Sequence, residues 1–67
     1  MTTKLTAYTF GKKKEMEFKE LKEAVTIALD MLNSVGVMPA QIKEYDKVVW
    51  IMTDDRDGSI EKLEGLR

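Results

Sequence analysis

The segment FKELKEAVTIALDMLNSVGVMP, residues 18–39, constrains the fold most, because its apolar residues recur at spacings of three and four. That periodicity is typical of an amphipathic helix. Gly36 and Pro39 follow the last apolar repeat, and residues of these types commonly end a helix. The pattern therefore predicts a helix over about residues 19–35. Its main apolar stripe comprises Phe18, Leu21, Val25, Ala28, Leu29, Leu32 and Val35.

Short runs rich in threonine, β-branched and aromatic residues lie on both sides of this helix. Before it, KLTAYTF and KEMEF flank a turn at Gly11-Lys12, and after it, QIKEY and KVVWIMT flank the polar turn Tyr45-Asp46-Lys47. Each pair of runs is typical of a β-hairpin. The sequence therefore predicts a single α+β domain, residues 1–67, in which one amphipathic helix packs on a small antiparallel sheet in the order ββαββ.

The segment SIEKLEGLR, residues 59–67, has two interpretations. Ile60, Leu63 and Leu66 are three residues apart, as on a helix, but Gly65 leaves such a helix little length. We expect a fifth strand at the edge of the sheet over residues 59–66, and a short C-terminal helix is the alternative.

The segment TDDRDGSIEKLE, residues 53–64, has some features of the calcium loop of helix-loop-helix proteins, with Asp55, Asp57, Gly58, Ile60 and Glu64 in the required places. Its first position is Thr53 where an aspartate ligand belongs, and the preceding residues have the pattern of a strand and not of a helix. The run Asp55-Arg56-Asp57-Gly58 is also typical of a type I turn. We therefore expect a tight turn between two strands, with no metal or cofactor.

The chain contains no cysteine, which excludes disulfides and thiolate metal sites, and no histidine, which removes the commonest general base and zinc ligand. The remaining candidates for catalysis are Asp54, Asp55 and Asp57, which lie in a polar segment where carboxylates are usually solvated. The sequence therefore predicts a protein that is not an enzyme.

Eleven lysine and arginine residues against twelve acidic ones give a net charge of −1, so no overall field attracts nucleic acid or an anionic membrane. No apolar run approaches the length of about 20 residues that spans a bilayer, and we expect a cytoplasmic protein with no membrane partner. Lys12, Lys13 and Lys14 form a local basic run that could contact phosphates. Tyr8 and Phe10 could stack on bases, but we expect them in the core.

The helix carries more apolar residues than one sheet requires. Ala24, Ile27 and Met31 widen its apolar arc, and we expect this shoulder to remain exposed in a monomer. In KVVWIMT, Val48, Trp50 and Met52 alternate with Val49 and Ile51, so this strand is apolar on both faces. We therefore expect a partner or oligomer interface at Ala24, Ile27 and Met31, or at Val49 and Ile51.

These features predict a small protein-binding module that forms a homodimer and acts as an inhibitor or adaptor of a larger target, as many phage and mobile-element proteins do. Two alternatives remain open. One is a nucleic-acid-binding module that uses Lys12 to Lys14, and the other is an oligomer that holds a small ligand between its protomers.

Overall fold

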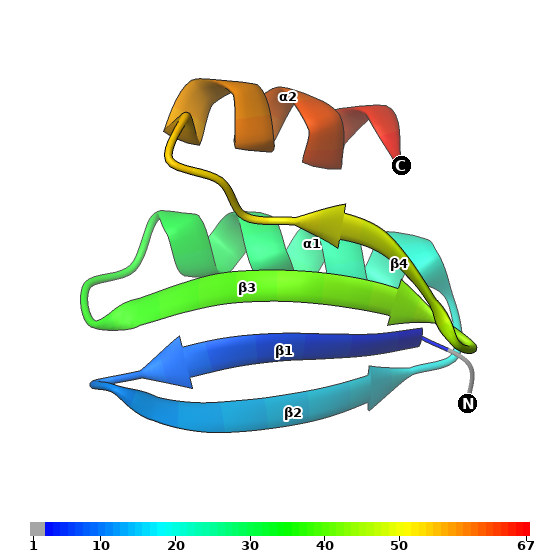
Figure 1. The fold of residues 1–67 in the computed structure, drawn as a ribbon, viewed down its shortest axis with the longest axis horizontal. Helices are drawn as coiled ribbons and strands as arrows, with labels where there is room; N and C mark the ends of the chain where they lie inside the picture. Colours follow the sequence, from blue (N-terminus) through cyan, green and yellow to red (C-terminus); the bar gives the residue numbers. More distant parts are fainter. Residues whose placement is uncertain (1–2) are drawn as a thin grey trace.

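The computed structural model describes residues 3–67 as a four-stranded antiparallel sheet with helices on one of its faces (Figure 1). In chain order the elements are β1 (Thr3–Thr9), β2 (Lys12–Phe18), α1 (Leu21–Leu32), β3 (Val37–Glu44), β4 (Lys47–Ile51) and α2 (Arg56–Gly65). The strand order is β2-β1-β3-β4, so β1 and β3 join the two hairpins and β2 and β4 form the edges. The predicted α+β class and the order ββαββ are confirmed, and a second helix follows β4.

Helix α1 is shorter than the predicted segment at both ends. At its start, the Glu20 N–H donates to Glu23 Oε1 at 3.1 Å, as part of a capping box. At its end, the side chains of Asn33 and Ser34 donate to the carbonyls of Leu29 and Asp30. These bonds satisfy carbonyls of the last turn, and the helix ends at Leu32, four residues before Gly36. Val35, expected in the apolar stripe, is therefore 94% exposed.

Both predicted hairpins are present. The turn between β1 and β2 is Phe10-Gly11, one residue earlier than expected, and both residues have positive φ, 51° and 83°. Positive φ at both central residues matches the right-handed twist of the adjoining strands. The aromatic Phe10 is an uncommon residue for such a position. Its N–H donates to the Gly36 carbonyl at 2.8 Å, which ties this turn to the loop after α1.

The C-terminal segment forms helix α2, so the expected edge strand over residues 59–66 is wrong and the helical alternative is correct. The expected turn between two strands at Asp55–Gly58 is wrong for the same reason. Asp55 is the N-cap of α2, and its Oδ1 accepts the Gly58 N–H at 3.1 Å. A type I turn and the first turn of a helix have similar backbone angles, so the same residues suit both.

The substitution Asp55→Ala is expected to lower the free energy of unfolding by about 0.5–2 kcal/mol, because the Gly58 N–H loses its side-chain acceptor. Asp57→Ala in the same turn is the matched control, since Asp57 has only the weaker attraction of a helix N-terminus for negative charge. Urea denaturation measures both. Equal losses for the two variants would contradict the capping role of Asp55.

The core lies between the sheet and the two helices. Its buried members are Leu5, Ala24, Val25, Ala28, Leu32, Ile42, Trp50 and Leu63. Two hydrogen bonds fix α2 in place: the Trp50 indole N–H donates to the Ser59 carbonyl at 3.0 Å, and Arg56 donates to the carbonyl of Leu32, the last residue of α1, at 2.9 Å. Helix α2 thus packs beside α1, and within residues 3–67 no helix covers the opposite face of the sheet.

Candidate partner-binding surfaces

The helix shoulder expected at Ala24, Ile27 and Met31 is not an exposed patch. Ala24 is fully buried, and Ile27 and Met31 are half-buried and pack against the core. The reason is α2, which lies against α1 and contributes Leu63 to the same cluster. The extra apolar arc of α1 therefore serves in large part to hold a second helix of the same chain. Ile27 still reaches the surface, in a shallow hollow that Phe18 and Arg67 also line.

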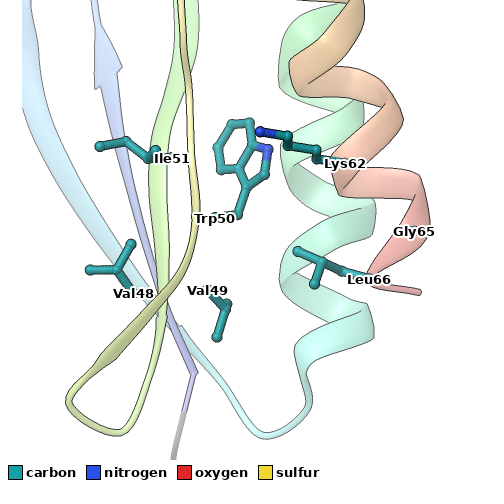
Figure 2. Close-up of a pocket in the computed structure, with 7 residues that line it drawn as sticks. All are labelled: Val48, Val49, Trp50, Ile51, Lys62, Gly65 and Leu66. Atoms are coloured by element: carbon teal, nitrogen blue, oxygen red, sulfur yellow. The ribbon is translucent and has the colours of Figure 1, made fainter.

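The two residues expected to share a face of β4, Val49 and Ile51, lie on opposite sides of the sheet. Trp50 pairs with Ile42 and Val48 pairs with Lys43, so Val49 is the extra residue of a β-bulge. Figure 2 shows Val49 and Trp50 directed toward the helices, and Val48 and Ile51 directed away from them. The expected strict alternation is therefore wrong. Ile51 is exposed as predicted, Val49 packs against the core, and Val48 replaces it on the uncovered face.

The uncovered side of the sheet, here named the open face, consists of three cross-strand rows. The rows are Lys13, Tyr8 and Met38; Glu15, Thr6, Gln41 and Ile51; and Glu17, Lys4, Lys43 and Val48. Alternation assigns these side chains to one face, because Leu5 and Ala7, which alternate with them in β1, point into the core. The open face is thus charged over β2 and apolar toward β4.

Four large apolar side chains form the open-face patch: Tyr8, Met38, Val48 and Ile51. Their exposed fractions lie between 43% and 56%, so each side chain is anchored on the sheet but keeps about half of its surface in water. Tyr8 and Met38 are cross-strand neighbours, and both line one shallow depression with Ile51. Val48 extends the patch along β4. This arrangement can bury apolar area against another flat surface.

The predicted phosphate-contacting residues Lys12, Lys13 and Lys14 are all exposed, on the edge strand β2. They do not point the same way. Lys13 lies on the open face, where its ammonium is 3.8 Å from Glu15, and Lys12 and Lys14 lie on the other side of the strand. The structure therefore does not bring the three ammonium groups together into one cluster.

Three residues of the open-face patch are not among the interface residues expected from the sequence: Tyr8, Met38 and Val48. For Tyr8 a signal was present, because Lys4, Thr6 and Tyr8 occupy alternate positions of one strand and two of them are polar. Met38 lies next to Pro39, which was interpreted as a helix terminator and not as part of strand β3. Val48 had no usable signal, because its orientation depends on the bulge.

Among residues 3–67, no group of three or more acidic side chains is arranged to hold a metal ion, and neither helix is long and apolar enough to cross a membrane. Comparison of the chain with protein-family models, with curated proteins and with solved structures gives no match. A functional proposal therefore has to come from the surface chemistry of the fold.

Proposed function

We propose that the chain is a non-enzymatic protein-binding module that forms a homodimer through its open face. The observation that supports this most is the open-face patch of Tyr8, Met38, Val48 and Ile51. Single exposed apolar residues are ordinary on protein surfaces, whereas several on one face are typical of interaction sites. A role as inhibitor or adaptor of a larger protein fits a small dimer of this kind.

The dimensions of the chain indicate how much of the open face a dimer would use. The chain measures 27 × 24 × 17 Å, and its strands run along the longest axis, with α2 beyond β4 on the second axis (Figure 1). A stable dimer buries about 800 Å² on each partner, roughly a sixth of the 4583 Å² that this chain exposes. Four strands spaced about 4.8 Å apart are roughly 19 Å wide, so an interface of that size would occupy nearly the whole open face.

The charges on the open face are compatible with self-association. Lys4, Lys13 and Lys43 share this face with Glu15 and Glu17, so it carries both signs. A two-fold axis brings the same surface of both copies together, and a face with both signs can then place lysines opposite glutamates. With a net charge of −1, overall repulsion between copies is small.

Sedimentation velocity at micromolar to millimolar concentration tests the proposal. We expect the sedimentation coefficient to rise with concentration from that of a 7.7 kDa monomer toward that of a dimer. The same measurement in high salt should leave a largely apolar association intact, because salt screens exposed charges and not apolar contacts. A monomer at all concentrations would contradict self-association.

One observation favours the alternative of nucleic-acid binding. Tyr8, expected in the core, is 43% exposed and lies opposite Lys13 on the open face. An aromatic ring beside an ammonium on an open sheet can stack on a base while the cation contacts a phosphate. Glu15 and Glu17 on the same strand oppose this interpretation, because they would repel the phosphate backbone.

The triple substitution of Lys12, Lys13 and Lys14 by glutamine separates the two functions. We expect self-association to change by less than about threefold, because Lys12 and Lys14 lie on the other side of β2 and Lys13 contributes only an exposed charge beside the apolar patch. Binding to a fluorescent oligothymidylate, measured by anisotropy at several salt concentrations, gives the second readout. Salt-sensitive binding of the wild-type chain that the triple substitution abolishes would support the nucleic-acid function instead.

A further inference from the structure

The two edges of the sheet differ in how they are protected from pairing with another strand. Edge strand β2 carries Lys12, Lys13, Lys14, Glu15 and Glu17, and all five are exposed. Such charges oppose the addition of a further strand. Edge strand β4 has one charged residue, Lys47 at its start, followed by four apolar residues, Val48–Ile51. The β4 edge therefore lacks the protection that the β2 edge has.

Backbone groups of β4 point outward from the sheet. Met52 donates its N–H to the Ala40 carbonyl at 2.8 Å. Because bonding alternates along an antiparallel ladder, the N–H and C=O of Ile51 point away from β3. Lys47 and Glu44 lie opposite each other across a two-residue turn, where the two residues of such a pair exchange backbone hydrogen bonds. The next residue, Val48, therefore directs its N–H and C=O away from β3. Since β4 is the edge strand, these groups have no strand partner within residues 3–67.

A groove runs along this edge, between β4 and the C-terminal half of α2. It is lined by Val48, Val49, Trp50 and Ile51 from the strand and by Lys62, Gly65 and Leu66 from the helix (Figure 2). Helix α2 lies beyond β4 when the sheet is viewed face-on (Figure 1), so it overhangs the position that a further strand would occupy. The groove thus presents the outward N–H and C=O groups of β4 on one side and apolar side chains beneath helix α2 on the other.

We propose that the β4 edge binds an extended segment of a partner protein, which adds to the sheet as a fifth strand beneath α2. Its backbone pairs with the outward groups of Val48 and Ile51, and its alternate side chains enter the groove beside Val49 and Leu66. Lys62, the charged residue of the lining, selects a segment with an acidic side chain at one of these positions. This inference rests on the proposed protein-binding function and identifies the target as an extended acidic-apolar segment.

A second copy of the chain fits this edge poorly, although its own β4 has the right composition. Symmetric antiparallel pairing of two β4 strands requires a two-fold axis normal to the sheet, which places both helix layers on the same side. Each α2 projects beyond its own β4 and would enter the helix layer of the other copy (Figure 1). Packed helices need about 8–10 Å between their axes. A single extended segment avoids this conflict.

The probe is a displayed library of random nine-residue peptides, selected on the wild-type chain. We expect the selected peptides to alternate apolar residues and to contain an acidic residue. Their binding should slow hydrogen exchange of the Ile51 amide, measured by NMR.

Ile51→Pro removes the Ile51 N–H while leaving the bonds to β3 intact, because an edge strand tolerates proline where the N–H faces outward. It should weaken binding about tenfold or more, whereas Ile51→Thr, which keeps the N–H, should weaken it less than about threefold.

A test on the peptide does not depend on whether the proline variant folds. Peptides that are N-methylated at an amide that pairs with Ile51 or Val48 should not bind. Peptides that are N-methylated at the amides between these positions should bind almost normally. Failure to select any peptide, or selected peptides that leave the Ile51 amide unprotected, would overturn the inference. Protection of Ile51 that rises with chain concentration in the absence of peptide would show a second copy at this edge and would also overturn it.

Failure of this inference and failure of the proposed homodimer are distinguishable. Peptides that bind Ile51→Pro normally but do not bind Met38→Glu would place the binding site on the open face and reject the β4 edge. A chain that sediments as a monomer and still protects its Ile51 amide with selected peptides would reject the open-face dimer and support the β4 edge.

Discussion

Replacement of Leu63 by alanine is expected to lower the free energy of unfolding by about 2–5 kcal/mol. Leu63 is fully buried and is the residue of α2 in the central cluster with Trp50 and Ala28. A domain of this size has a total stability of only several kcal/mol, at about 0.05–0.15 kcal/mol per residue. The variant should therefore be partly unfolded at 25 °C, which urea denaturation and circular dichroism would show.

Leu66→Ala is the matched control, because it removes the same atoms from a half-buried position in the turn that ends the same helix. Its loss should be less than half of that for Leu63→Ala, since much of the Leu66 side chain already contacts water. Similar small losses for both variants would show that α2 contributes little to the core. The account of the covered helix shoulder would then be wrong.

The substitution Met38→Glu is expected to raise the dissociation constant of the homodimer by at least about 100-fold. Loss of one buried apolar side chain costs about 1.5–3 kcal/mol, and the carboxylate must in addition lose water at the interface. Ile51→Glu should have a similar effect, because Ile51 lines the same depression. Both side chains are exposed in the single chain, so the free energy of unfolding should change by less than about 1 kcal/mol.

Val35→Glu is the matched control for these variants. Val35 is 94% exposed, but it lies in the loop after α1 and outside the three rows of the open face. This variant adds the same charge to an exposed apolar position and should leave the dissociation constant unchanged within about threefold. Ile27→Glu tests the surface expected from the sequence. Dissociation by Ile27→Glu, with no effect of Met38→Glu, would move the interface to the hollow on α1.

The elements with strong local patterns could be predicted from the sequence. Apolar residues recur at every second position in the hairpin strands and at every third or fourth position in α1. The turn residues Gly11 and Asp46 mark where the strands of each hairpin meet. The end of α1 was predicted less well, because Gly36 suggested a later stop than the one that the Asn33 and Ser34 side chains provide. Helix boundaries depend on such individual hydrogen bonds, which periodicity does not report.

Helix α2 could not be assigned with the same certainty, because its segment has few apolar residues and contains two glycines, Gly58 and Gly65. Its stability comes from tertiary contacts, such as the bond between the Trp50 indole and the Ser59 carbonyl. The error had a consequence for function. Without α2, the apolar surface of α1 at Ala24 was interpreted as an interface, although the chain itself covers it.

The open face was only partly predictable. Ile51 was correctly expected to be exposed, since strand KVVWIMT is apolar on both faces and a helix covers only one of them. The position of Val48 beside it depends on the bulge at Val49, and a single inserted residue reverses the orientation of every residue on one side of it. No local pattern in the sequence indicates where such a bulge falls.

The most direct test of the open-face homodimer is an isotope-filtered NMR experiment on an equal mixture of ¹³C-labelled and unlabelled chains, which detects contacts between copies only. We predict intermolecular nuclear Overhauser effects that involve Tyr8, Met38 and Ile51, and none that involve Val35. Intermolecular effects confined to Ile27 and Phe18, or their absence at millimolar concentration, would contradict the proposal that the open face joins two copies.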